Sequence, residues 1–212
     1  MCAALLVLTA TATEAQTAAE TRELAVGIVW TAPVSLGEVN ADLTAPGGAP
    51  FVLFRTDSDI ASGLGFEVSF LERLTERLDL EVAGAWARAN VRTRVSADFE
   101  GVDDVELVNR LTRFTIEGGA LWRVAERDQA IWFVRGSGGW LRELDEASAL
   151  AENGFVINVG GGVRYWFQPA SASGSRVGLR VEGRLMMRQT GPSLGDELQI
   201  GPALMAAAVF RF

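Results

Sequence analysis

The chain has 212 residues, 49% of them hydrophobic and 22% charged, which excludes a disordered, collagen-like or disulfide-rich protein. Its formal net charge of -8 argues against a nucleic-acid partner, because such partners select a basic surface. The sequence contains no His and a single Cys, Cys2, so it cannot form an intramolecular disulfide.

The first element in chain order is an apolar run of small residues, MCAALLVLTATATEAQ. It ends near Thr13-Glu14-Ala15, which resembles a signal-peptidase site, although the run lacks the basic residues that usually precede it. We interpret residues 1–15 as a signal-peptide remnant and residues 16–212 as the mature domain. No other segment reaches the 18 apolar residues of a membrane-spanning helix.

Alternation of apolar and polar residues then predicts eight β-strands along the rest of the chain. In FVINVGGGVRYWF, for example, Phe155, Ile157 and Val159 share one face, and Asn158 and Arg164 share the other. Each strand is long enough to cross a bilayer at a tilt. The predicted strands cover residues 23–31, 63–72, 78–89, 113–125, 130–142, 155–167, 177–188 and 201–212.

The connections between these strands alternate in length. Two are tight and one is modest, and the other four are long: residues 32–62, 90–112, 143–154 and 189–200. Short turns at one end and long loops at the other are typical of outer-membrane barrels. In the first long connection, FVLF (51–54) is too apolar for a plain loop, so it either extends a strand beyond the membrane or folds back over the barrel mouth.

The polar face of the predicted strands mixes charges of both signs with Gly and Ala. Such a face suits the narrow interior of an eight-stranded barrel, where Arg side chains can pair with carboxylates. We predict a packed interior charge network, and the alternative is a selectivity element of a narrow, porin-like pore. The residues of this predicted network are Glu67, Glu81, Glu117, Arg135, Arg164, Arg180, Glu182 and Arg184.

The apolar face carries five of the six Trp residues, and its aromatic residues fall into two bands. Aromatic girdles at two heights are typical of membrane barrels, whereas a lipocalin-like pocket has no reason to segregate them. Arg88 does not fit this face, so its strand must reach the interface there or contain a bulge. The predicted bands contain Trp30, Trp86 and Trp140 toward the long loops, and Trp122, Trp132, Tyr165 and Phe167 toward the short turns.

NVGGGVRYWF (158–167), VGLRVEGR (177–184) and the strand that ends in Phe212 resemble the small eight-stranded barrels of the OmpA/OmpX/OmpW-like superfamily. The resemblance implies an all-β, antiparallel, up-and-down transmembrane barrel in a Gram-negative outer membrane. It also implies a monomer with periplasmic termini and extracellular loops, in contact with lipid and lipopolysaccharide. Phe210 and Phe212 would form the C-terminal signal for the barrel-insertion machinery.

The sequence thus predicts an outer-membrane barrel with a structural or surface-interaction role, no cofactor, and no catalytic or metal-binding residues. One alternative is an OmpW-like channel or conduit for small apolar compounds, supported only by FVLF. A membrane-embedded lipid-modifying enzyme is disfavoured, because such enzymes use a His base that this chain lacks. Acidic residues in the long connections indicate a repulsive surface, or else a divalent cation shared with lipopolysaccharide phosphates.

Overall fold

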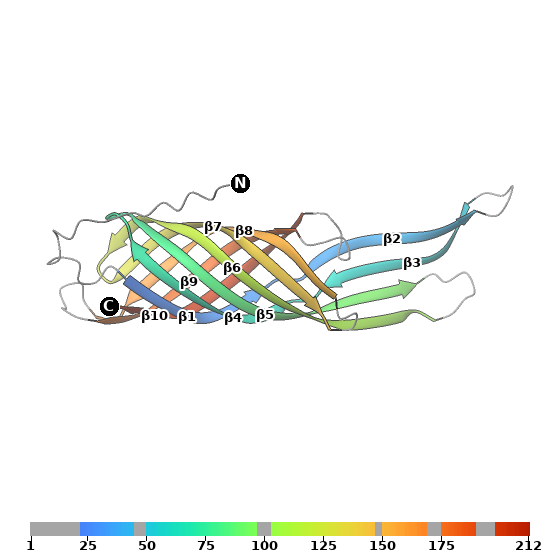
Figure 1. Cartoon of the computed structure of the whole chain (residues 1–212), viewed down its shortest axis with the longest axis horizontal. Coiled ribbons are helices and arrows are strands. Elements are labelled where there is room, and N and C mark those ends of the chain that lie inside the picture. Colours follow the sequence, from blue (N-terminus) through green and yellow to red (C-terminus); the bar gives the residue numbers. More distant parts are fainter. Residues whose placement is uncertain (1–21, 45–49, 97–102, 147–149, 169–174, 190–197) are drawn as a thin grey trace, which may run out of the picture.

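The computed structural model describes residues 22–44, 50–96, 103–146, 150–168, 175–189 and 198–212. The predicted signal-peptide remnant lies outside these ranges. Within them, no helix is long and apolar enough to span a membrane. The described residues form one antiparallel sheet of ten strands (Figure 1): β1 (Arg22–Thr31), β2 (Val34–Thr44), β3 (Pro50–Ile60), β4 (Gly63–Arg73), β5 (Leu78–Ser96), β6 (Val105–Arg127), β7 (Ala130–Asp145), β8 (Leu150–Trp166), β9 (Arg176–Gln189) and β10 (Gln199–Arg211).

Eight of these strands close into a ring in the order β1-β4-β5-β6-β7-β8-β9-β10. β10 pairs back with β1, from Glu23 opposite Arg211 to Thr31 opposite Ala203. Closure leaves no unpaired strand edge within the ring. The predicted all-β antiparallel architecture is confirmed, but the sheet has ten strands where the sequence predicts eight.

The two additional strands, β2 and β3, lie in the segment predicted as the first long loop. β3 pairs with the end of β5, from Arg55 opposite Ser96 to Ile60 opposite Val91, and the same part of β5 pairs with β6. Together, β2, β3, residues 91–96 of β5 and residues 105–109 of β6 form a sheet that we call the loop-end extension. It projects from one end of the ring (Figure 1), so FVLF lies on β3 in this projection and does not cover the ring's mouth.

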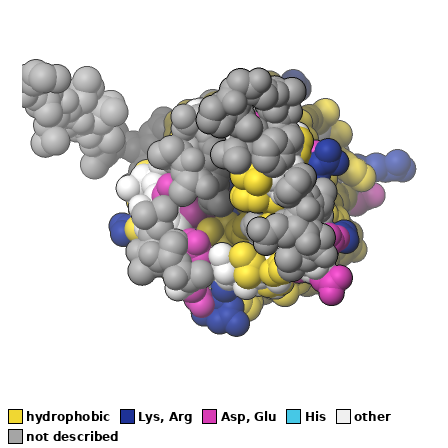
Figure 2. All heavy atoms as spheres, turned by 90° about the vertical axis from the view of Figure 1, so that its right-hand side faces the viewer, with side chains coloured by type: hydrophobic (Ala, Val, Ile, Leu, Met, Phe, Trp, Pro, Cys, Tyr) yellow, Lys and Arg dark blue, Asp and Glu magenta, His cyan; other side chains and the backbone are white. Residues whose placement is uncertain are grey.

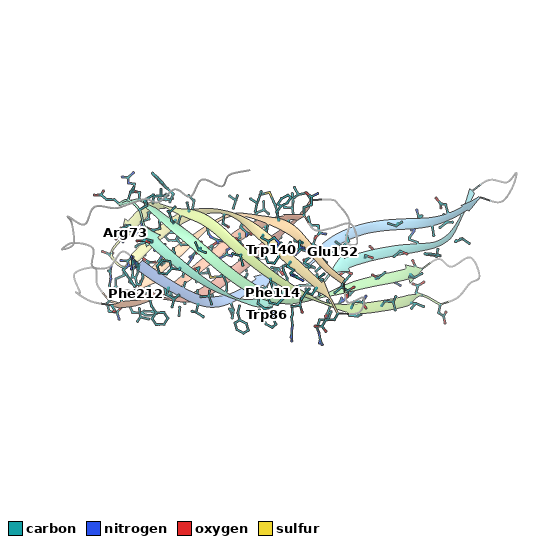
Figure 3. All side chains as sticks on the ribbon, viewed as in Figure 1. Arg73, Trp86, Phe114, Trp140, Glu152 and Phe212 are labelled. Atoms are coloured by element: carbon teal, nitrogen blue, oxygen red, sulfur yellow. The ribbon has the colours of Figure 1, made fainter. Side chains whose placement is uncertain are left out.

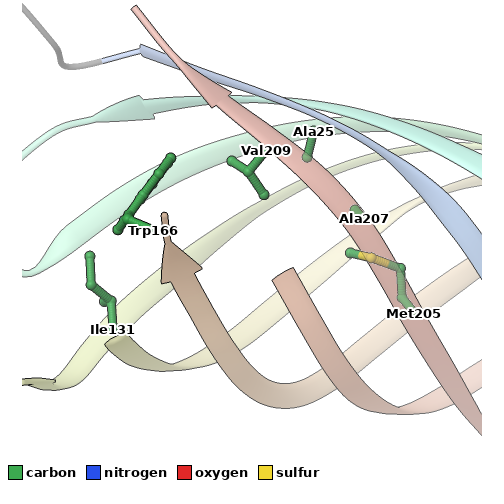
Figure 4. Close-up of a cluster of buried hydrophobic side chains, with 6 residues drawn as sticks. All are labelled: Ala25, Ile131, Trp166, Met205, Ala207 and Val209. Carbon is green, nitrogen blue, oxygen red and sulfur yellow. The ribbon is translucent and has the colours of Figure 1, made fainter. Parts of the chain in front are cut away.

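Within the ring, the usual burial pattern of a water-soluble protein is reversed. Along β4, Leu64, Phe66 and Val68 are exposed on the outer face, whereas Glu67 and Ser69 are buried inside. Because side chains of a strand alternate between its two faces, this pattern puts charge inside and apolar surface outside. Apolar side chains also occupy part of the interior, near β10 (Figure 4): Ala25, Ile131, Trp166, Met205, Ala207 and Val209.

Two backbone positions have left-handed φ values, and each explains a local feature. Asp128 (φ 53°) lies in the two-residue turn between β6 and β7, a geometry that Asp tolerates in tight hairpins. Gly37 (φ 99°) lies where the register of β2 against β3 shifts after Ser35. Only Gly adopts that conformation without strain, so the bulge needs a glycine there.

Adjacent glycines on β7 provide a test of how closely the strands of the ring approach. A Cβ on the inward-facing Gly139 would overlap the carbonyl oxygen of Ile116 on β6, whereas one on the outward-facing Gly138 would lie 3.6 Å from the carbonyl oxygen of Val156. We expect G139A to lower the free energy of unfolding in detergent by about 1–3 kcal/mol, since the backbone must shift. G138A should change it by less than about 0.5 kcal/mol in the same urea titration. Equal effects of G139A and G138A on the free energy of unfolding would contradict the close approach of β6 to β7 at Gly139.

Candidate functional site

The centre of the ring holds a set of buried ion pairs built around Glu182. Its carboxylate, fully buried, accepts hydrogen bonds from Arg180 (2.5 and 2.9 Å) and from Arg184 (2.5 Å). Arg184 also forms a two-point contact with Glu67, at 2.5 and 2.6 Å, and Arg180 contacts Glu81 at 2.6 Å. The two-point contact between Arg184 and Glu67 is directional, so it fixes the relative positions of β9 and β4, and the bond from Arg180 to Glu81 connects β9 to β5.

Arg135 on β7 connects this set to the opposite wall of the ring. Its guanidinium lies 2.5 Å from Glu81 on β5 and 3.6 Å from Glu117 on β6. Glu117 in turn accepts hydrogen bonds from Ser137 and Asn158, both at 2.8 Å. We call these seven charged residues the central network: Glu67, Glu81, Glu117, Arg135, Arg180, Glu182 and Arg184.

Arg164, the remaining residue of the predicted network, belongs to a second group nearer the short turns. It contacts Glu23 at 2.5 Å and Asp79 at 3.3 Å. Asp79 also accepts two hydrogen bonds from Arg123 (2.6 and 3.1 Å), and Glu23 accepts two from Arg211 (2.6 and 2.9 Å). Sequence reasoning missed these four partners, although they share the inward parity of their strands.

These side chains fill the middle of the ring. Arg164 and Arg180 also stack over Phe133, with guanidinium carbons 5.5 and 5.0 Å from the ring centroid. Above the central network, a cavity of about 20 Å³ lies between Glu117, Arg184 and Arg113. Such a volume holds about one water molecule. Paired charges therefore fill the middle of the ring.

The outer face carries aromatic side chains at two heights. Toward the loop end, Trp86 lies opposite Phe114 and stacks on Phe66, with ring centroids 6.2 Å apart. The guanidinium of Arg88 lies 4.8 Å from the Trp86 centroid, and the register of β5 is continuous there, so no bulge accounts for Arg88. Trp30 and Trp140 are exposed on the same face, and Figure 3 labels Trp86, Phe114 and Trp140.

Toward the short turns, the outer face has a second set of aromatics. Tyr165 and Phe167 pack edge to face at 6.0 Å, and the Tyr165 hydroxyl donates a hydrogen bond to Gln129. Between the two heights, the exposed side chains are mainly aliphatic. The exposed aromatic residues at this end are Phe70, Trp122, Trp132, Tyr165, Phe167, Phe210 and Phe212.

The loop end combines acidic and apolar surface, and Figure 2 shows both kinds of side chain on its rim. In the loop-end extension, Arg94 pairs with Asp104 at 2.6 Å, and Val39, Leu107 and Val108 are exposed. Among the described residues, no cluster of His, Cys, Asp or Glu is arranged to hold a metal ion. Several acidic residues of the long connections lie outside the described ranges: Asp98, Glu100, Asp196 and Glu197.

The opposite end of the ring has a hollow of about 480 Å³, which we call the terminal hollow. Figure 3 labels Arg73 and Phe212 there, far from the loop-end extension. The charged residues that line the terminal hollow are Arg73, Glu76, Arg77, Arg123, Glu126, Arg176 and Arg211.

No family model matches the chain, and no curated protein matches it by sequence. Several solved structures are similar in fold. Three of them are Ail, the attachment invasion locus protein of Yersinia pestis (13% identity, TM-score 0.38, covering 92% of this chain and 99% of that one), the outer membrane protease OmpT from Escherichia coli (9%, 0.36, 96% and 99%) and the beta domain of the Bordetella autotransporter BrkA (10%, 0.31, 92% and 99%). Because these identities and TM-scores are low, function is inferred from the chain's own side chains.

Proposed function

We propose that the protein is an integral outer-membrane β-barrel whose eight-stranded ring spans the bilayer. The observation that carries this proposal is the apolar surface on the outside of the ring, which is found on all eight of its strands. Its members include Val26, Ile28, Leu64, Val68, Leu80, Val82, Ile116, Val134, Ile157, Val159, Leu179, Val181, Leu185 and Leu204.

Such a surface is unfavourable in water and favourable in lipid. Burying apolar surface is worth roughly 25 cal/mol per Å², so this belt calls for an apolar solvent around it. The hydrocarbon core of a bilayer also requires that every backbone polar group be paired internally, and a closed ring of strands meets that condition. The aromatic residues at two heights then lie at the two interfaces of the membrane.

We assign the short-turn end to the periplasm and the loop-end extension to the cell exterior, as in other outer-membrane barrels with short periplasmic turns. The proposed role is non-enzymatic and concerns surface interaction, with the ring as its anchor. Among the residues that the structure describes, β2 forms one unpaired edge of the extension and residues 105–109 of β6 form the other. Free strand edges next to exposed Val39 and Val108 are suited to pairing with an extended segment of a partner.

The interior favours this role over a channel. A pore needs a continuous path, whereas the central network bridges opposite walls of the ring through paired Arg and Glu side chains. A conduit for apolar compounds has less support, because its only candidate residues, 51–54, lie on β3 in the extension. The lack of His in the chain supports a non-enzymatic role.

A refolding and conductance experiment tests the proposal. After refolding in detergent, we expect the protein to migrate differently on gels before and after boiling, because the closed ring resists unfolding by the detergent. In planar bilayers, we expect no large, stable, ion-selective current steps. Identical migration before and after boiling, together with helical circular dichroism, would contradict the barrel. Stable, ion-selective current steps would show that the interior is a pore and is not packed.

A further inference from the structure

We propose that the terminal hollow binds a phosphate-bearing anion. Its volume of about 480 Å³ lies in the range of small-ligand sites, and five of its lining residues are arginines. Planar guanidinium groups match the oxygens of phosphate with two-point hydrogen bonds. The inference rests on the proposed function in one respect, which is that the proposed function places the hollow on the periplasmic side of the membrane.

Four strands and one turn bring these arginines together. Arg73 ends β4, Arg77 lies in the turn that follows, Arg176 begins β9 and Arg211 ends β10. Arg123 lies on β6, where the register against β7 shifts between Arg123 and Ala125. The residues are far apart in the sequence and converge only because the ring brings these strand ends to one rim.

Several of these guanidinium groups have N–H donors that are not used in the hydrogen bonds described above. Arg123 and Arg211 use Nε and Nη2 to bind Asp79 and Glu23, which leaves Nη1 of each for another acceptor. In the part of the chain that the structure describes, neither Arg73 nor Arg77 forms an ion pair. The Nε of Arg73 is shielded from solvent and has no acceptor there.

The charge of the described lining also favours an anion. Among the residues that line the terminal hollow, five are arginines and two are glutamates. Phosphate offers several oxygens, so it can accept hydrogen bonds from more than one guanidinium group.

A buried aromatic side chain next to the hollow holds two of its arginines in place. The guanidinium carbon of Arg211 lies 4.2 Å from the Trp166 ring and that of Arg176 lies 5.4 Å from it. Trp166 is 2% exposed, and its indole N–H has no acceptor among the described residues. Stacking on a fixed ring preorganises a guanidinium, so less conformational entropy is lost when an anion binds.

Calorimetric titration of the refolded full chain with sodium pyrophosphate tests the site. We expect saturable binding at low salt, weakened at least about tenfold in R73Q/R77Q, because two charge-assisted donors are lost. The matched control is R127Q, an exposed arginine at the same end that does not line the hollow, which should stay within about twofold of the original protein. Because neither Arg73 nor Arg77 forms an ion pair among the described residues, we expect R73Q/R77Q to fold. Heat-dependent gel migration checks the folding of each variant.

The anion could be soluble or could be a lipid headgroup, and native mass spectrometry separates these sources. Retention of pyrophosphate but not short-chain phosphatidylglycerol indicates a soluble ligand, and the reverse indicates a headgroup. Absence of saturable binding of either to the folded protein, or equal affinity in R73Q/R77Q, would overturn the inference. Loss of heat-dependent migration in the unmodified chain would instead contradict the barrel, so the two failures are distinguishable.

Discussion

E182Q is expected to lower the free energy of unfolding in detergent by about 3–5 kcal/mol, the cost of leaving buried charge without its partner. The Glu182 carboxylate lies within hydrogen-bond distance of Arg180, Arg184 and Arg135. The amide of Gln keeps the shape but supplies no negative charge. Urea titration of the refolded protein, followed by Trp fluorescence, measures the change.

The matched control is E106Q, which removes an exposed carboxylate from the loop-end extension. It should change the free energy of unfolding by less than about 0.5 kcal/mol. If E182Q fails to fold, E182Q/R180M should restore part of the stability, since it also removes one of the unpaired guanidinium groups. An unchanged midpoint for E182Q would mean that the carboxylate is solvated and the interior is not packed.

V82R is expected to lower the stability of the protein in phospholipid vesicles by about 2–4 kcal/mol, as Arg does at the middle of a bilayer. Val82 is 61% exposed on the outer face of β5, four residues from Leu78, which lies opposite Trp122, and four from Trp86. It therefore lies midway between the two aromatic bands. Urea titration in vesicles measures the difference.

The same substitution in the extension serves as the control. Val39 on β2 is 69% exposed, so an arginine there changes the side chain to a similar extent but stays in water. V39R should change the free energy of unfolding by less than about 0.5 kcal/mol. Similar costs for V82R and V39R would show that the belt does not lie in hydrocarbon.

The strands of the ring could be predicted from the sequence because each has one face toward lipid and one toward a charged interior. The contrast between these environments produces the alternation seen in residues 155–167, which fall within or directly after β8. β2 and β3 could not be found in this way. Both of their faces are largely exposed to water, so nothing imposes a period of two, and only the apolar FVLF marked the segment as unusual.

The interior residues show a similar limit. Parity along a strand places Glu67 and Arg184 inside, but it does not show that they pair, because they are 117 residues apart. Their contact depends on how neighbouring strands are staggered around the ring. Parity also places Arg123 inside, but it does not reveal the register shift between Arg123 and Ala125 at the end of β6.

The ion pair between Glu23 and Arg211, 188 residues apart, has a consequence for the order of folding. It lies on the seam between β1 and β10, so it forms only when the ring closes. Before closure, the sheet is open, and inner charges such as Glu23 have neither their partners across the seam nor protection from the membrane. Strands of an open sheet would carry these charges into hydrocarbon at a cost of several kcal/mol each. For the proposed outer-membrane barrel, we therefore expect insertion into the bilayer to be coupled to closure of the ring.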